Sequence, residues 1–372
     1  MSDNATTGVS SFFIDKTKPL EERMMKKSIT ITLSMVAITA LVGCGQSGSD
    51  TGEAPTDLVI STWGFAEDFF NEEVYAPFEE EHNVNIVVDI GNNAERLNRI
   101  RQGTATIDVI YLSDYYAQQG IDEGLFANID RSRIPAIDDL YELAQAPLGD
   151  EYGPAYTVGQ FGIAYNPDEV ESPITSWSDL WDEGLSNNIT IPNITATTGP
   201  MFLDAASIVA GEDTFNEDAA FDQLTTLKAN VVKEYDRTSD FVNMFSQGEI
   251  VAGPFMEMYL KDLLAAVPGT EFVTPSEGAY AVLNTVNVVE GSDNKELAEE
   301  FINWHLSKEV QEASAKAKID SPVNKLVELS PDEAEGITYG EDTINELKLL
   351  DMEFVNEQSA QWIDRWNREI AN

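Results

Sequence analysis

The sequence has few of the residues that most enzyme and metal sites require. It contains one cysteine and two histidines among 372 residues. A single cysteine excludes an internal disulfide, and no spaced group of His and Cys offers a zinc site. His82 and His305 have no Ser or Cys nucleophile arranged near them in the sequence, so both are interpreted as structural. We therefore expect no metal, no cofactor and no enzymatic activity.

Basic residues are scarce as well. The chain has 22 Lys and Arg against 66 Asp and Glu, a formal net charge of −44. Nucleic acids and anionic lipid surfaces are poor partners for such a chain, because binding them depends on Lys and Arg that displace counterions. No Gly-rich phosphate loop ending in Lys-Ser or Lys-Thr is present, so the protein is not itself an ATPase. Carboxylates are so numerous that a glycosidase-like pair arises by chance.

Long apolar runs are nearly absent, and the one near the N-terminus indicates export. Lys26 and Lys27 precede the apolar residues 29–42, the layout of a secretory signal, and the run is too short for a comfortable membrane span. Gly43 directly before Cys44 resembles the lipobox of bacterial lipoproteins, in which the cysteine is lipidated. The alternative is an ordinary cleaved signal and a buried free thiol.

These features divide the N-terminal part of the chain into three segments. Residues 1–24 are expected to be an upstream extension, because a methionine stands directly before the two lysines. Residues 25–43 are the predicted lipoprotein signal peptide. Residues 44–56, rich in Gly, Ser and Asp, read as a flexible tether. The predicted location is extracytoplasmic, with a lipid on Cys44 as the sole membrane anchor.

Alternating strands and helices follow the tether. Strands are predicted at residues 58–63, 84–90 and 107–112, with helices between them, which favours a parallel α/β sheet. The continuous apolar pattern of residues 84–90 is typical of a buried parallel strand. Binding sites of such sheets lie beyond the carboxyl ends of the strands. The residues found there are Trp63, Phe65, Ser113, Asp114 and Tyr115.

A second α/β pattern begins after a strand that leaves the first one. Residues 156–165 form this crossing strand, residues 280–289 return, and strands at 189–191 and 250–254 lie between. A last long helix is predicted over residues 342–372. The resulting boundaries are a first lobe of residues 57–158 and 287–329, a second lobe of residues 159–286, and a helical segment of residues 330–372 that packs across the lobes.

Two groups of residues at predicted strand or helix ends are candidate ligand contacts. Aromatic faces of Trp63 and Tyr115 would contact apolar or cationic groups at little entropic cost. Thr197, Thr198 and Gly199 open a helix with Pro at its start, which favours an anion or a polar oxygen. An ordinary helix cap explains the second group equally well.

Several short motifs, in this order and spacing, resemble one protein family from residue 58 to the C-terminus. They are Ser61-Thr62-Trp63, Ile107-Asp108-Val109 leading to Ser113-Asp114-Tyr115-Tyr116, Ser176-Trp177-Ser178-Asp179-Leu180-Trp181, Gln247-Gly248-Glu249 and Ser321-Pro322-Val323-Asn324. The chain resembles the extracellular solute-binding proteins of ABC importers, in the broad family of the spermidine/putrescine-binding proteins. The resemblance implies a type II periplasmic-binding-protein fold, with two α/β lobes joined by crossing hinge strands and a ligand cleft between them.

The resemblance also implies roles for single residues. Trp63 and Tyr115 match the ring walls of the polyamine-binding proteins. The chain departs from that family where Asn284 stands in place of a ligand-binding carboxylate, and where the Thr and Gly stretch replaces an acidic pair of the second lobe. Asp114 and Glu257 are the carboxylates that remain for an ammonium group. The complete predicted ligand set is Trp63, Phe65, Ser113, Asp114, Tyr115, Thr197, Thr198, Gly199, Ser239, Phe255, Glu257 and Asn284.

The predicted function is a substrate-binding lipoprotein of an ABC importer that captures a small polar organic solute, a polyamine or a related compound. Its expected partners are the permease subunits with their ATPase, and the protein is expected to be a monomer. Two alternatives stay open from the residues alone. One is a surface lipoprotein with an unrecognised hydrolase activity, for which no nucleophile is evident. The other is a structural or adhesive module, against which the aromatic residues at strand ends argue.

Overall fold

The computed structural model describes residues 54–371. The predicted extension, the signal peptide, Cys44 and nearly all of the tether therefore lie outside the described residues. Within this part of the chain no helix is both long and apolar enough to cross a membrane.

One sheet of nine strands runs through the described residues. Eight strands follow the order β2-β1-β3-β9-β4-β7-β5-β6, and β8 pairs with β4. Their bounds are β1 Thr56–Thr62, β2 Val84–Ile90, β3 Val109–Ser113, β4 Ala155–Tyr165, β5 Ile189–Pro192, β6 Val231–Tyr235, β7 Ala252–Met256, β8 Glu271–Val273 and β9 Tyr280–Val288.

Helices cover the sheet on both sides. The α-helices are α1 Glu67–Phe69, α2 Ala76–His82, α3 Asn93–Arg101, α4 Asp114–Asp122, α5 Glu142–Gln145, α6 Gly199–Val209, α7 Glu217–Leu227, α8 Thr238–Ser246, α9 Leu260–Ala266, α10 Lys295–His305, α11 Lys308–Lys316, α12 Pro331–Ala334, α13 Glu341–Asn345 and α14 Met352–Glu369. A π-helical turn, η2 (Phe70–Tyr75), joins α1 to α2. The 3₁₀ turns are η3 Arg131–Arg133, η4 Pro135–Asp139, η5 Trp177–Trp181, η6 Glu183–Leu185 and η7 Glu257–Tyr259.

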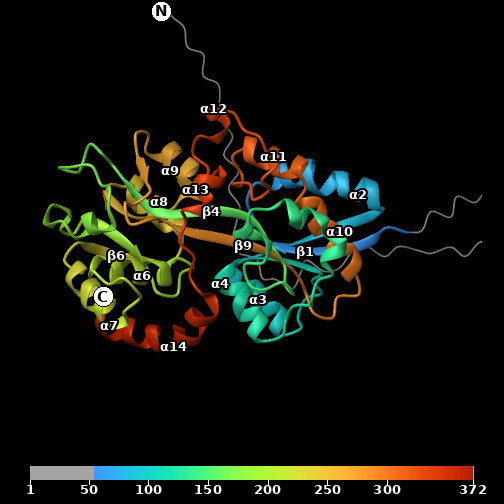
Figure 1. Ribbon diagram of the computed structural model, residues 1–372, viewed down its shortest axis with the longest axis horizontal. Helices are drawn as coiled ribbons and strands as arrows, with labels where there is room; N and C mark the ends of the chain where they lie inside the picture. The colour runs from blue at the N-terminus through green and yellow to red at the C-terminus, as the bar shows by residue number, and fades with distance from the viewer. Residues whose placement is uncertain (1–53, 372) are drawn as a thin grey trace, which may run out of the picture. The chain divides into compact units, whose positions relative to one another are not determined.

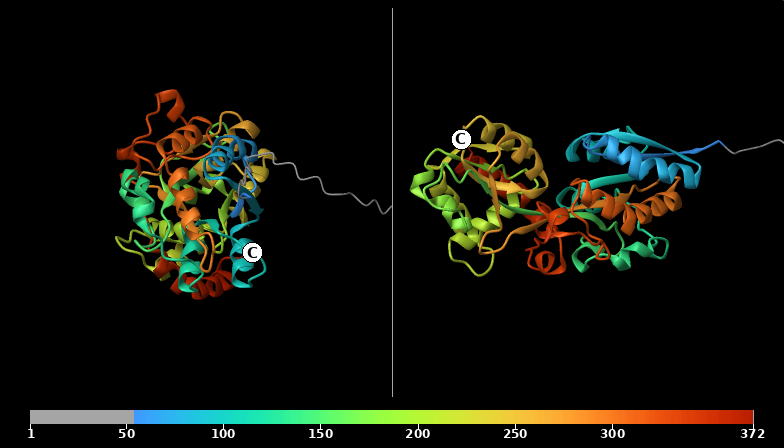
Figure 2. Two further views of the ribbon diagram at one scale, coloured as in Figure 1. Left: turned by 90° about the vertical axis from the view of Figure 1, so that its right-hand side faces the viewer. Right: turned by 90° about the horizontal axis from the view of Figure 1, so that it is seen from above.

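Two long antiparallel strands connect the two halves of the sheet. Every residue of β4 and of β9 is buried, and the two strands pair side by side from Ala155 to Phe161. Figure 1 shows them running together through the middle, with α2 and α10 at one end and α6 and α7 at the other. The view from above in Figure 2 shows the same division. The prediction of a crossing strand and a return strand is thus confirmed.

The first lobe has a parallel sheet, as the sequence predicts. β1 pairs in parallel with β2 and with β3, and β9 closes this half in the antiparallel sense. Its larger core holds residues such as Phe78, Tyr111, Phe301 and Leu306. A smaller core on the other face packs α3 and α4 against the sheet.

The prediction that residues 84–90 form a buried strand is wrong in one respect. β2 has the predicted bounds and is parallel, but it lies at the edge of the sheet and most of it is accessible. Val87, Val88 and Ile90 are 39%, 38% and 48% exposed. An apolar run indicates a strand but does not report how many neighbours that strand has, since burial is set by the elements packed around it.

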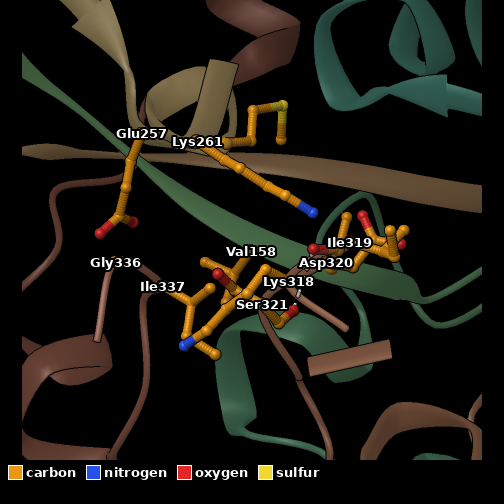
Figure 3. A pocket seen from close by; sticks show the side chains of 11 residues that line it. Val158, Glu257, Lys261, Lys318, Ile319, Asp320, Ser321, Gly336 and Ile337 are labelled. Carbon is orange, nitrogen blue, oxygen red and sulfur yellow. Dashed lines mark hydrogen bonds between the residues drawn. The ribbon is translucent and has the colours of Figure 1, made fainter. Parts of the chain in front are cut away.

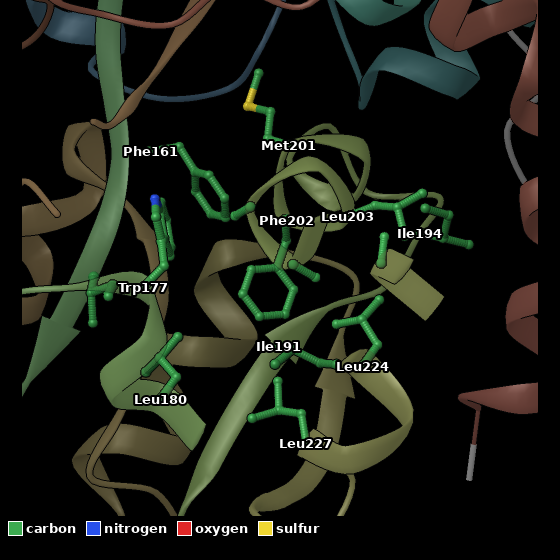
Figure 4. Close-up of a cluster of buried hydrophobic side chains, with 14 of the residues drawn as sticks. Phe161, Trp177, Leu180, Ile191, Ile194, Met201, Phe202, Leu203, Leu224 and Leu227 are labelled. Atoms are coloured by element: carbon green, nitrogen blue, oxygen red, sulfur yellow. The ribbon is translucent and has the colours of Figure 1, made fainter. Parts of the chain in front are cut away.

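The second lobe is organised around β5, which pairs in parallel with β6 and β7. Figure 4 shows its core, in which Phe202 of α6 lies among Trp177, Ile191 and Leu224. A third cluster, with Phe241, Phe245 and Phe255, fills the space under α8 and α9. Strands β6 and β8 were not predicted, because β6 carries Lys233 and Glu234 and β8 is only three residues long.

The single long helix predicted over residues 342–372 is also wrong. The structure has α13 and α14 with an extended link between them. Lys348 in this link pairs with Tyr280, and its backbone exchanges hydrogen bonds of 2.9 and 2.8 Å with Ala279 and Ala281. These backbone bonds compete with continued helix, which explains why helical spacing of apolar residues alone overestimated the element.

Helix α14 belongs to the core of the second lobe. Trp362 and Trp366 are buried in the same cluster as Phe202 and Ile191. The indole N–H of Trp366 donates to Glu234 at 2.8 Å, and Arg365 forms ion pairs with Glu217, Asp218 and Glu369. At its other end α14 reaches α4, where the Asn356 amide donates to the Tyr115 carbonyl at 3.3 Å. This helix therefore contacts elements of both lobes.

Candidate functional site

The carboxyl ends of strands from both lobes meet at one point. Ser113 ends β3, and Thr197 lies in the loop between β5 and α6. Their hydroxyl oxygens are 3.4 Å apart. Asn284 of β9 pairs with Ser113 on one side and with Thr157 of β4 on the other. We call Ser113, Thr197 and Asn284 the interlobe cluster.

Asp114 adds a carboxyl group beside this cluster. It begins α4 directly after Ser113, its side chain is buried, and its Oδ1 accepts from the Tyr115 backbone N–H at 2.8 Å. Burial raises the pKa of Asp114 to about 7, while the backbone N–H groups act in the opposite direction. A cation entering this position would supply the interaction that the carboxylate lacks.

The end of β1 presents two aromatic side chains on a strained loop. Trp63 is half-buried, and Phe65 is 40% exposed with its ring edge-to-face with Phe70 at 5.7 Å. Ala66 adopts a left-handed conformation, with φ of 49°, and the π-helical turn η2 begins four residues later. Strained backbone and π-turns are concentrated at functional sites. The loop therefore fits the role of a ligand wall.

One basic residue of this region, Arg96 of α3, was missed by the sequence analysis. Its side chain is fully buried, and its guanidinium lies 4.6 Å from the centroid of the Trp63 ring. Burial lowers its pKa to about 10. In sequence Arg96 looks like any basic residue on a surface helix, so no pattern could have identified it.

A small pocket lies beside the hinge strand β4. Residues of β4, η7, α9, the segment 318–321 and the segment 336–337 line it, and its volume is about 20 Å³, roughly the room of one water. Figure 3 shows Glu257 and Asp320 at opposite ends of this hinge pocket, with the Lys261 side chain extending toward Ile319 and Asp320.

Both acidic side chains of the hinge pocket bond to neutral groups. The Thr338 hydroxyl donates to Glu257, and the Ser314 hydroxyl lies 3.5 Å from Asp320. Burial raises the pKa of Glu257 and raises that of Asp320 to about 7. The lysines do not neutralise them: Lys261 and Lys318 donate to backbone carbonyls, at 3.5 Å to Ala317 and 2.6 Å to Glu335.

The burial of Asp320 predicts a pH-dependent stability difference. The pKa of Asp320 is near 7 in the folded state and about 3.9 in the unfolded chain, so the folded state binds more protons between these pH values. The free energy of unfolding therefore falls as the pH rises through this range. We expect the free energy of unfolding of Asp320→Asn to rise by ~1–3 kcal/mol relative to that of the wild type between pH 5 and pH 8. Urea unfolding at both pH values measures this, with the exposed Glu80→Gln as control. An Asp320→Asn difference that is independent of pH would contradict the prediction.

Three predicted ligand residues, Phe255, Thr198 and Gly199, are buried, and a fourth, Ser239, is exposed. Phe255 is fully buried with its ring 4.8 Å from that of Phe241, so it is a core residue. Thr198 is buried and hydrogen-bonded to the Tyr235 hydroxyl. Gly199 is required for packing, because a Cβ there would lie 2.4 Å from the Asn193 carbonyl oxygen. Ser239 is exposed in the first turn of α8.

Tyr115 is a different case: only 5% of it is exposed, and its ring packs into the core cluster of the second lobe although α4 belongs to the first. Its neighbour Tyr116 lies edge-to-face with it at 5.2 Å. In the described conformation Tyr115 therefore connects the lobes.

The two histidines have the structural surroundings that the sequence suggests. His305 is buried next to the Tyr111 hydroxyl, 2.6 Å away, and burial lowers its pKa to about 3. His82 stacks on Phe78 at 4.1 Å and lies 3.3 Å from Glu300. Among residues 54–371, no group of three or more His, Cys, Asp or Glu is arranged to hold a metal ion.

A two-lobed α/β fold with strand ends facing each other defines the class of solute-binding proteins. The family model of bacterial extracellular solute-binding proteins matches residues 73–338, which is most of the chain. The protein belongs to this family. Its fold is that of type II periplasmic binding proteins, as the resemblance in the sequence implies.

Individual relatives agree with this assignment. The spermidine/putrescine-binding periplasmic protein 1 of Haemophilus influenzae is 24% identical over 307 residues, 78% of this chain and 82% of that protein. The putrescine-binding periplasmic protein SpuD of Pseudomonas aeruginosa is 23% identical over 313 residues, 77% of this chain and 82% of its own.

A crystal structure of an ABC transporter protein from Clostridium perfringens shares 45% identity. It superposes with a TM-score of 0.76 and covers 84% of this chain and 99% of that one. The structure of PotD from Streptococcus pneumoniae is 20% identical with a TM-score of 0.69, covering 84% of this chain and 99% of its own, which supports the fold.

Proposed function

We propose that the protein is the solute-binding lipoprotein of an ABC importer. It is tethered through a lipid on Cys44 at the extracytoplasmic face, captures a small polar organic solute between its lobes, and delivers it to the permease subunits with their ATPase. The observation that supports this most directly is the meeting of Ser113 and Thr197, strand-end residues from different lobes, at 3.4 Å. A Cys44→Ser variant that remained in the membrane fraction would contradict the anchor.

The lobes of this proposal keep the boundaries expected from the sequence. The first lobe comprises residues 57–158 and 287–329, the second comprises residues 159–286, and residues 330–372 pack across them. The continuous β4 and β9 strands act as the hinge, because few other backbone segments join the two cores. Rotation about such strands opens and closes a cleft, and the permease would select the closed, loaded form.

The proposed ligand contacts are side chains at or just past strand ends, together with Asn284 in the middle of β9. The strand-end residues are Trp63, Phe65, Ser113, Asp114 and Thr197, with Tyr115 available when the lobes separate. Glu257 and Asp320 lie at the hinge pocket, so we assign them to the hinge rather than to the solute.

An amine is the favoured solute class. Asp114 is a buried carboxyl whose bonds are to backbone N–H groups and whose pKa is raised by burial, so an ammonium group would complete its surroundings. The names of the relatives, spermidine/putrescine-binding and putrescine-binding proteins, support the same class. The hydrolase alternative has no comparable support.

A thermal-shift screen with amines, amino-acid derivatives and thiamine-like compounds tests the proposal. A true ligand present at 100 times its dissociation constant adds about 2.7 kcal/mol to stability. If the ammonium group of the ligand binds Asp114, the Asp114 carboxyl should release its proton on binding at pH 6, because the bound cation favours the ionised carboxyl. Calorimetry in two buffers should therefore show proton release at pH 6 and none at pH 8.5. The absence of any stabilising amine would contradict the proposed class.

A further inference from the structure

Arg96 bonds to the backbone of β1 and β3 and to the residue just past β2. Its Nε donates to the Gly91 carbonyl at 2.9 Å, and its Nη1 donates to the carbonyls of Ser61, at 3.0 Å, and Tyr111. Its Nη2 donates to the Asn93 side chain at 3.1 Å. One side chain thus ties together β1, the end of β2 and β3, and it does so directly behind the Trp63 ring.

The charge of this guanidinium is held by neutral oxygen atoms. All four partners are carbonyl or amide groups, and the nearby Asp89 carboxylate is paired with Arg99 at 2.8 Å. With its side chain fully buried, Arg96 is screened little by solvent. One face of the Trp63 ring therefore already interacts with a cation.

We propose that Arg96 is a positioning and charge-selecting residue of the first lobe. Arg96 fixes the orientation of the Trp63 ring, and its guanidinium repels any cation from the opposite face of that ring. The solute therefore presents an uncharged or anionic group to Trp63 and carries at most one positive charge. This inference deepens the proposed function and rests on it, because Trp63 must contact the solute. It narrows the solute class from polycations to single amines and zwitterions.

The distance between the two positive charges sets how much a second positive charge on the solute weakens binding. The guanidinium lies 4.6 Å from the ring centroid, and an ammonium on the other face at a similar distance would be about 9 Å from it. Like charges at that separation near a protein surface repel enough to weaken binding by roughly tenfold or more. Asp114 is a partner for one ammonium, whereas Asn284 offers a neutral amide and cannot balance a second.

The first arm of the test measures the local charge at Trp63 without a ligand. Quenching of tryptophan fluorescence by iodide and by caesium is measured at constant total salt for the wild type, Trp63→Phe and Trp181→Phe. The difference between the wild type and each variant gives the quenching of the indole that the variant lacks. Trp181 is the control, since it is also half-buried and its N–H donates to the Gln223 carbonyl at 3.1 Å. We expect the iodide-to-caesium ratio of Trp63 to be at least threefold that of Trp181. Equal ratios would overturn the role of Arg96.

The second arm compares three solutes of equal chain length by calorimetry: butane-1,4-diamine, butan-1-amine and 4-aminobutanoate. We expect the diamine to bind at least tenfold more weakly than the tighter of the other two. A diamine whose affinity is within tenfold of that of the tighter of the two would overturn the inference and leave the proposed function intact. If none of the three binds, the amine class of the proposed function fails, and the quenching ratio still decides the role of Arg96.

An Arg96→Gln variant separates positioning from simple structural support. If it folds, the Trp63 quenching ratio should fall to that of Trp181 and the penalty for the diamine should disappear. A folded variant that keeps both would overturn the inference. If the variant does not fold, the first two arms remain decisive, because neither depends on it.

Discussion

Solute affinity should fall by about 100-fold when Trp63 is replaced by alanine. The ring is half-buried at the end of β1, and Arg96 fixes its orientation, so a solute lying on it loses a large preorganised contact in the variant. Truncating an aromatic anchor of this kind typically costs 2 kcal/mol or more, which is about a 30-fold loss, and loosening of the β1 loop adds to it.

Titration calorimetry with the solute identified by thermal shift measures this effect. Trp63→Phe is the matched control, because it keeps an aromatic face and should retain most of the affinity. Circular dichroism should show that both variants are folded, since Trp63 only packs against the edge of the first core. An unchanged dissociation constant in folded Trp63→Ala would mean that the solute binds elsewhere.

The second large effect concerns stability. Trp366→Ala should lower the free energy of unfolding by ~3–5 kcal/mol, the usual range for removing a buried Trp from a core. Its side chain is fully buried, contacts Phe221 edge-to-face at 6.4 Å, and donates to Glu234 at 2.8 Å. The variant also leaves the partly buried Glu234 carboxylate without this donor.

Leu349→Ala is the control for Trp366→Ala. Leu349 lies in the link before α14 and is 54% exposed, so its truncation should change stability by about 0.5 kcal/mol or less. Guanidinium unfolding of both variants measures the difference. Equal effects would mean that α14 is not part of the second-lobe core.

The strand pattern of the sequence was sufficient to predict two α/β halves with a crossing strand and a return strand between them, because parallel strands alternating with helices leave few topologies. The same pattern could not rank burial. Residues 84–90 and 156–165 are both mostly apolar with a few polar residues, yet β2 is an accessible edge and every residue of β4 is buried. The difference depends on which strands lie beside them, and those come from distant parts of the chain.

The site was predicted unevenly for a similar reason. Trp63 and Asp114 directly follow strands and Ser113 ends one, so position in the predicted sheet was enough to propose them as ligand contacts. Phe255 and Thr198 occupy equally suggestive positions in sequence, but one side chain points into the α8 and α9 core and the other toward Tyr235. Arg96 is distant from Trp63 in the sequence, and only the fold brings its guanidinium over the Trp63 ring.

Capture of a solute between two lobes can be tested by measuring the distance between them. Spin labels placed on the exposed positions Glu80 of the first lobe and Glu212 of the second, in a Cys44→Ser background, report this distance. Addition of a solute that stabilises the protein should shorten and narrow the distance distribution, and Trp63→Ala should shift the midpoint to higher solute concentration. A distribution that stays the same while calorimetry shows binding would contradict capture between the lobes.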